Sequence, residues 1–368
     1  MAVSDIKGVA TSTTAFVGPT PQGPLNTPVA LASVADFERS FGSVDAAGVL
    51  GSSVSLFFAN GGTSAYVVRV PLGTPPGIAD YGDATAGTGI YSLDAVEILN
   101  LVCLPAAADD PALFPIYPLA ASYCEKRKAL LLVDLPQNSS IADAQSWMTT
   151  AGATIRSRNV AAYYPSLIVP AASGGAPTPV PCAGAVAGVF ARNDTTRGVW
   201  RAPAGTDATI LGILGLATDL TDPQAASLSA TALNCLRTFP NIGPVIWGDR
   251  TMLGADGSAD EFTYVQVRRL DLFIEKSIQE GTRWAVFEPN RPALWTQITT
   301  AVTAFLQQLF RQGAFAGATS DQGFFARCDG TTMSEADLQA GILNIVVGFA
   351  PLKPAEFIIL SIRQLTQP

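Results

Sequence analysis

Short apolar segments alternate with helical patterns through the middle of the chain, and this alternation limits the possible folds more than any other feature. The apolar segments cover residues 98–104, 129–135 and 160–169, and helical patterns at 112–126 and 141–151 separate them. Strands that are apolar along their whole length are buried on both faces, and helices between such strands are typical of a parallel sheet covered on both sides. The sequence therefore predicts a mixed α/β fold.

The stretch at residues 71–90 is rich in Pro, Gly, Thr, Ala and Asp and offers little to bury, so we interpret it as a domain boundary. Before it, the pattern is strand, helix, helix, strand, with the first strand expected from Gly8 to Val17. We predict an inner domain built from both chain ends, residues 1–85 and 236–368. Residues 86–235 are predicted to form an inserted outer α/β domain.

A long amphipathic helix is predicted from Pro292 to Arg311. Its apolar residues recur every three or four positions, which is the spacing of one buried stripe, and proline is well tolerated in the first turn of a helix. Gln297, Gln308 and Arg311 fall on the polar side. The last apolar strand, Phe357–Ile362, needs a pairing partner, which is either its own sheet or another chain.

The residue types needed for most catalytic sites are missing or isolated. The chain contains no histidine, so triads and zinc sites that use histidine are excluded, and no phosphate-binding glycine motif occurs. Asp134 follows an apolar strand, where α/β enzymes place catalytic groups, but without a partner base we interpret it as a turn or helix cap. We predict no catalytic residue, no metal site and no cofactor, and hence no enzyme.

Charge and composition narrow the class of partners. Only 14% of residues are charged, against roughly 25% in typical soluble domains, and the net charge is −8. A chain with so few charged residues would leave much uncharged surface in water, which favours burial of that surface against neighbouring subunits. The alternative explanation of the composition is a large, well-filled core. With no basic cluster, nucleic acid is not expected as a partner. Prolines interrupt the longest uncharged run, residues 160–191, so no direct membrane insertion is expected. Five cysteines without metal-ligand spacing suit reduced thiols in a cytoplasmic protein.

Several motifs along the chain resemble those of contractile tail sheath proteins. The C-terminal part carries WAVFEPNRPALW, GAFAGATSDQGFFARCD and GFAPLKPAEFIILSIRQL; the stretch VIWGDRT precedes them, and GVATSTTAFVGPTPQGP and FFANGGTSAYVVRV lie near the start. This resemblance implies a structural subunit that polymerises helically around a rigid tube and contracts to drive the tube through a target envelope. It also implies assembly in the bacterial cytoplasm into a phage tail or phage-like particle.

The resemblance further implies which partners and residues are involved. The partners would be further copies of the chain, an inner tube protein, and baseplate and tail-terminator proteins. Terminal strands would be exchanged between subunits. The residues expected in that exchange are Val9, Thr11, Thr13, Phe357, Ile358, Ile359, Leu360 and Ile362. Two alternatives stay open: a hydrolase carried on the middle α/β domain, and a non-contractile baseplate or tube-terminating protein.

Polar side chains that face the tube or a neighbouring subunit are a second group of candidates. On the predicted C-terminal helix these are Gln297, Gln308 and Arg311. Arg250, Arg268 and Arg269 flank apolar strand and helix ends, with acidic residues nearby. These arginines form either intramolecular ion pairs or salt bridges between subunits that change partners on contraction.

Overall fold

The structure, a computed structural model, comprises two compact units. The described residues are 5–71, 77–171, 175–258, 260–352 and 358–365. One unit contains residues 11–268, and the other contains the first ten residues together with residues 269–368. The division falls within the first turn of helix α8 (Val265–Gly281). We describe each unit by itself.

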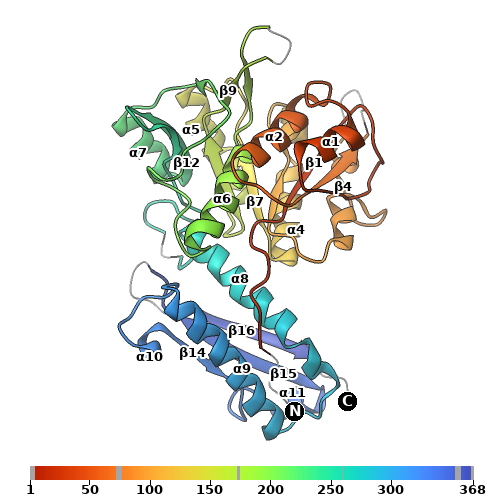
Figure 1. The fold of residues 1–368 in the computed structure, drawn as a ribbon, viewed down its shortest axis with the longest axis vertical. Helices are drawn as coiled ribbons and strands as arrows, with labels where there is room; N and C mark the ends of the chain where they lie inside the picture. Colours follow the sequence, from red (N-terminus) through yellow and green to blue (C-terminus); the bar gives the residue numbers. More distant parts are fainter. Residues whose placement is uncertain (1–4, 72–76, 172–174, 259, 353–357, 366–368) are drawn as a thin grey trace. The chain divides into compact units, whose positions relative to one another are not determined.

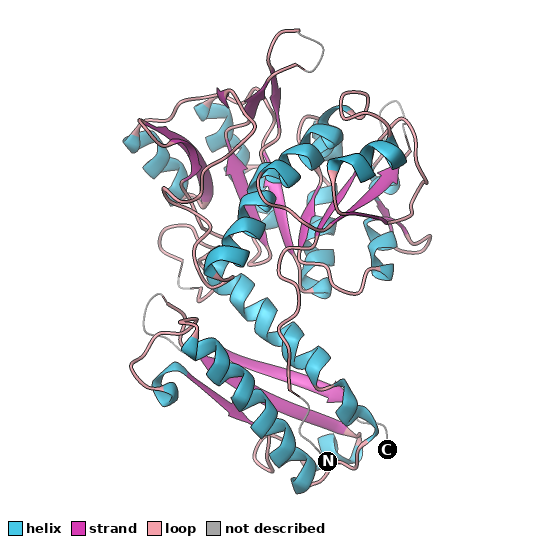
Figure 2. Cartoon of the chain, viewed as in Figure 1, coloured by secondary structure: helices cyan, strands magenta, loops and turns pink. Residues whose placement is uncertain are grey.

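An eight-stranded sheet forms the centre of the larger unit (Figures 1 and 2). The strand order is β13-β12-β8-β7-β6-β1-β3-β2. The strands are β1 (Thr14–Pro19), β2 (Val29–Leu31), β3 (Ala65–Val70), β6 (Leu101–Cys103), β7 (Leu130–Asp134), β8 (Val160–Tyr164), β12 (Leu233–Phe239) and β13 (Gly243–Ile246). All neighbours from β12 to β3 pair in parallel, and only the edge strands β2 and β13 are antiparallel. The predicted α/β fold is confirmed, and β6, β7 and β8 lie within the three predicted apolar segments.

Helices cover both faces of this sheet and bury a separate apolar core on each face. On one face lie α1 (Val34–Phe41), α2 (Gly48–Ala59) and α6 (Ala183–Arg197); on the other lie α4 (Ile116–Arg127), α5 (Ile141–Thr149) and α7 (Asp222–Ala230). Helices α2 and α6 pack closely, since a Cβ atom at Gly184 would overlap the carbonyl oxygen of Ser53. A sheet buried on both faces is a rigid block.

Shorter elements fill the connections of the larger unit. They are α3 (Ile78–Tyr81), β4 (Gly82–Asp83), β5 (Thr88–Gly89), β9 (Leu167–Val169), β10 (Thr178–Val180) and β11 (Gly215–Leu216), with 3₁₀ turns at Ile90–Ala95, Pro105–Ala107, Pro111–Leu113 and Gly152–Ile155. Strands β10, β9 and β11 form a small separate sheet.

The smaller unit packs two long helices with a three-stranded antiparallel sheet (Figure 1). Its helices are α8, α9 (Pro292–Arg311), α10 (Ser320–Gly323) and α11 (Glu335–Gln339), with a 3₁₀ turn η5 (Arg283–Phe287) between α8 and α9. The sheet order is β14 (Phe324–Arg327), β15 (Ile342–Phe349) and β16 (Ile358–Leu365). Helix α9 has the predicted bounds, and its buried residues follow the predicted stripe from Leu294 to Leu309. Among the described residues, no helix has the length and apolar character needed to cross a membrane.

The domain boundary predicted near residue 86 differs from the division in the structure. Strand β1 pairs with β3 on one side and with β6 on the other, so one sheet continues across residues 71–90. Residues 11–85 and 236–268 therefore belong to the same compact unit as residues 86–235. A Pro- and Gly-rich stretch marks a loop, but hydrogen bonds between distant strands decide where a domain ends.

Candidate functional site

The terminal strand β16 pairs along its whole length with β15 of the same chain. The antiparallel register runs from Ile342 opposite Leu365 to Phe349 opposite Ile358. Four residues predicted for strand exchange, Ile358, Ile359, Leu360 and Ile362, lie in this strand, and Phe357 lies outside the described residues. Strand β16 is an edge of its sheet, so its outer backbone groups are a template for a further strand. The pairing matches the alternative in which the strand completes its own sheet, and exchange stays a prediction.

The predicted N-terminal exchange residues form no strand in this chain. Strand β1 begins at Thr14, six residues later than predicted. The amide of Val9 donates to Ser277 Oγ at 3.1 Å, and the amide of Thr13 donates to Asn100 Oδ1 at 2.9 Å. The Thr11 hydroxyl donates to an Asp194 carboxylate oxygen at 2.5 Å. These three donor groups thus form hydrogen bonds to side chains of other segments and not to the backbone of a neighbouring strand.

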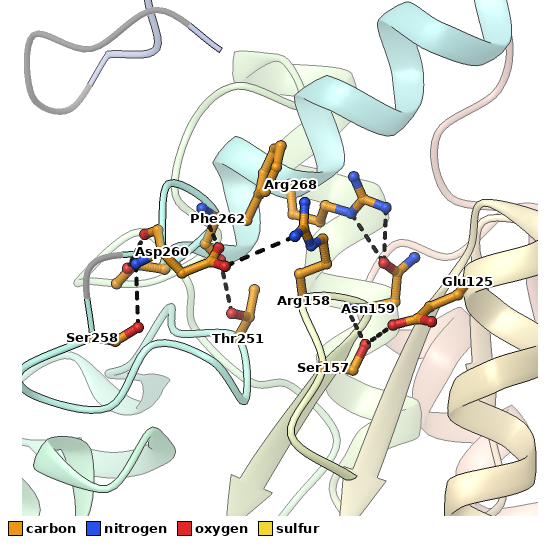
Figure 3. A network of polar contacts seen from close by, with 10 residues as sticks. Glu125, Ser157, Arg158, Asn159, Thr251, Ser258, Asp260, Phe262 and Arg268 are labelled. Atoms are coloured by element: carbon orange, nitrogen blue, oxygen red, sulfur yellow. Dashed lines mark hydrogen bonds and ion pairs between the residues drawn. The ribbon is translucent and has the colours of Figure 1, made fainter. Parts of the chain in front are cut away.

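Arg268 anchors the start of α8 to the α/β unit (Figure 3). Its Nε and Nη2 atoms donate to Asn159 Oδ1 at 3.1 and 2.8 Å. Asn159 is fully buried, and its Nδ2 donates to the carbonyl oxygen of Ala129 at 2.7 Å. The Phe262 ring lies against two guanidinium groups, 5.0 Å from that of Arg268 and 4.8 Å from that of Arg158. Each guanidinium therefore gains a cation–π contact in a partly desolvated place.

The other two candidate arginines are also engaged or buried within the chain. Arg250 Nη1 donates to the Gly254 carbonyl oxygen at 2.8 Å and pairs with Asp256 at 2.6 Å. Arg269 is only 4% exposed. Arg250 thus forms the intramolecular ion pair of the first alternative, and Arg268 is held within the chain by hydrogen bonds to the neutral Asn159 amide. The burial of Arg269 in this chain favours the intramolecular alternative for it, and a contact with a tube or a neighbouring subunit stays a prediction.

The polar side of α9 carries the residues that the sequence predicts for it. Gln308 and Arg311 are exposed, and Gln297 is partly buried. The three residues share one side of the helix because they are 11 and 3 positions apart, close to whole turns of 3.6 residues. This side of α9 is a candidate contact surface.

Asp134 is a helix cap, as predicted. It is 3% exposed, and its Oδ1 accepts hydrogen bonds from the amides of Cys182 and Ala183 at 2.7 and 2.8 Å, at the start of α6. Burial raises the pKa of this carboxyl from its ordinary value of 3.8 to about 7, although the amide hydrogen bonds oppose the shift. The position of Asp134 at the end of an apolar segment indicated a cap, but nothing in the sequence identified α6 as the helix it would cap.

A shallow hollow next to the end of β7 is a candidate for a catalytic pocket. Two carboxylates line it, Asp109 and Asp143. Asp109 accepts from the amide of Gln137, and Asp143 closes the capping box of α5 with Ser140. The Ser140 hydrogen bonds lower the pKa of Asp143, which makes it a weaker proton carrier at neutral pH. Within the described residues no group of three potential metal ligands occurs. Each carboxylate has a structural role, and the hydrolase alternative gains no support.

Comparisons with known proteins point to tail sheath proteins over most of the chain. Residues 79–252 match the model of the phage tail sheath protein central domain, and residues 258–364 match that of the phage tail sheath C-terminal domain. The tail sheath protein of Vibrio phage KVP40 is 26% identical over an alignment of 345 residues that covers 83% of this chain and 49% of that protein. The chain thus spans about half the length of this curated relative.

Two solved assemblies resemble nearly the whole chain. The helical sheath of the anti-feeding prophage in its contracted state is 29% identical, with a TM-score of 0.78, over 97% of this chain and 94% of that one. The PVC sheath complex of an extracellular contractile injection system, also contracted, is 28% identical, with a TM-score of 0.78, over 99% of this chain and 94% of that one.

Proposed function

The chain belongs to the phage tail sheath protein family, and from this premise we propose that it is the structural subunit of a contractile sheath. The observation that carries the proposal is the similarity, over 97% of the chain, to a helical sheath solved in the contracted state. In this proposal, copies polymerise helically around a rigid tube, bind a baseplate at one end, and drive the tube through a target envelope when they contract.

The two units suit this role physically. The larger unit is a sheet buried between two helical layers, which moves as a rigid body during a rearrangement of subunits. The smaller unit has a sheet with two open edges, β14 and β16, which suit links between subunits. Contraction then exchanges contacts between rigid bodies while the links hold, and the work is stored during assembly, so no nucleotide is needed.

The proposed link is an exchange of the terminal strand. All eight residues of β16 pair with β15 within the chain. The same ladder forms if β16 reaches the β15 strand of a neighbouring copy, because both strands keep identical partners and the number of backbone hydrogen bonds does not change. The other contacts between subunits in the polymer then favour strand exchange over pairing within one chain.

Truncation tests this link. A chain that ends before Ile359 is expected to stay folded and monomeric and to form no sheath, because the donated strand is missing. A matched control that lacks only residues 366–368 keeps β16 and should assemble normally. If the shorter chain unfolds, β16 completes its own core and the exchange proposal is wrong. Circular dichroism gives the folded state, and sedimentation velocity gives assembly.

The polar side of α9 has two candidate partners, the tube and a neighbouring subunit. Contacts through Gln297, Gln308 and Arg311 would be modest in each subunit and strong through repetition. The double substitution Gln308→Glu with Arg311→Glu separates the two. If the variant no longer binds the tube but still forms sheath-only polymers, the partner of this side of α9 is the tube. If both assemblies are lost, the partner is a neighbouring subunit.

We place the subunit in a phage tail or phage-like particle assembled in the bacterial cytoplasm. All five cysteines are buried and free of disulfides, which suits folding in a reducing compartment.

A further inference from the structure

Phe287 is the most exposed large apolar side chain among the described residues. It ends the turn η5, and 81% of its surface is accessible to water. A single exposed apolar residue is ordinary on a protein surface, so it becomes informative only if the molecule also offers a place that could receive it.

The smaller unit contains such a place beside α9. A hollow of about 550 Å³ lies between α8, α9 and residues 5–8. Phe273 of α8 and Phe305 and Leu309 of α9 provide apolar walls, and the small, exposed residue Ala304 also lines the hollow. Gln308 and Gln312 contribute polar atoms at the edge. The hollow therefore combines apolar walls with a polar rim, which is the usual anatomy of a protein interface.

One copy of the chain does not fill its own hollow with Phe287. The residue is absent from the lining, and its side chain is almost fully exposed. The exposed ring and the open apolar hollow therefore lie at separate places on one compact unit. A projection and a matching hollow at different places on identical subunits form a head-to-tail contact, which repeats along a helix.

The charges beside the two features are complementary. Glu288 follows Phe287, while Lys7 lines the hollow and Arg311 is exposed in the same turn of α9 as Gln308. Asp5, the acidic residue of the lining, has a counterpart in the exposed Arg291, which lies four positions after Phe287. Each feature thus carries charges of both signs, so opposite charges are available on the two sides of a docked contact.

From these observations we propose that Phe287 of one subunit inserts into the hollow beside α9 of a neighbouring subunit. The proposal rests on the proposed sheath function and names one contact within it. The ring of Phe287 is buried against Phe273, Phe305 and Leu309, and Glu288 approaches Lys7. The neighbouring subunit, rather than the tube, then contacts the Gln308 end of α9.

Engineered cysteines test the contact directly. In the variant Phe287→Cys/Ala304→Cys, mild oxidation of assembled protein should link neighbouring copies and give a ladder of multimers on a non-reducing gel. Background should be low because the native cysteines are buried. The matched control is Phe287→Cys/Thr296→Cys, since Thr296 is exposed on α9 but outside the hollow, and it should give no ladder.

Assembly gives a second readout. The substitution Phe287→Ala is expected to raise the concentration needed for polymerisation by about tenfold or more, because burial of the ring is lost. Its fold should persist, since the side chain is exposed. Glu288→Lys and Lys7→Glu should each weaken assembly, and the two together should recover part of it.

Three outcomes would overturn the inference. Sheaths that form without a ladder from the Phe287→Cys/Ala304→Cys variant would refute the contact and leave the sheath function standing. An intrachain crosslink in Val3→Cys/Ala304→Cys, with Phe287→Ala assembling normally, would assign the hollow to the chain's own first residues. A wild-type chain that never polymerises would overturn both proposals.

Discussion

Replacement of Asp134 by asparagine should change the pH dependence of stability in a predictable way. The carboxyl is buried at the start of α6, and burial raises its pKa from 3.8 to about 7. The folded state therefore holds a proton that the unfolded state releases. The stabilisation is fully present below pH 3.8 and is lost as the pH rises through about 7. Asparagine keeps a side-chain oxygen that accepts both amide hydrogen bonds, and its side chain does not titrate in this pH range.

The size of the effect follows from the shift. A pKa that rises from 3.8 to about 7 on folding corresponds to about 4 kcal/mol between the fully protonated and fully ionised limits. Over an accessible range from about pH 5 to about pH 8.5, the wild-type chain should lose about 3 kcal/mol of unfolding free energy relative to Asp134→Asn.

Urea unfolding of both chains at several pH values measures this difference. Comparison of the two curves cancels the contributions of all other titrating groups. Curves that stay parallel across the range would show that Asp134 is ionised in the folded state at all these pH values. The account of α6 capping by a largely protonated carboxyl would then be wrong.

Three further predictions concern the larger unit and the thiols. Arg268→Ala should lower the unfolding free energy by about 1–3 kcal/mol in denaturant titrations, because the buried Asn159 oxygen loses both donors; an unchanged midpoint would contradict the anchoring role. Gly184→Ala should destabilise by about 1–3 kcal/mol because its new methyl group overlaps the Ser53 backbone, whereas Gly215→Ala, which has open space around it, should be nearly neutral. Since burial raises the pKa of all five thiols, native protein at about pH 8 should react with a thiol reagent far more slowly than unfolded protein; rapid native labelling would show that a cysteine is accessible.

Local patterns in the sequence predicted local structure well. The bounds of α9 follow from one amphipathic stripe, the proline in its first turn and Gly313 after its end. The strands β6, β7 and β8 could be predicted because strands buried on both faces are continuously apolar. In both cases the residues that determine the element are its own.

Pairings between distant residues could not be predicted in the same way. The hydrogen bonds between β1 and β6 join residues on either side of the stretch at 71–90, so the two compact units divide the chain elsewhere than at the predicted boundary. Arg268 and Asn159 are 109 positions apart, and no local pattern links them. The hollow beside α9 likewise depends on how residues 5–8, Phe273 and α9 come together in space.

Electron microscopy of the purified chain tests the central claim most directly. A sheath subunit should polymerise on concentration into hollow cylinders of uniform diameter, and their helical reconstruction should accommodate both compact units and show β16 beside a β15 strand. A chain that stays monomeric at all concentrations, or that forms only closed rings or irregular aggregates, would contradict the assignment as a contractile sheath subunit.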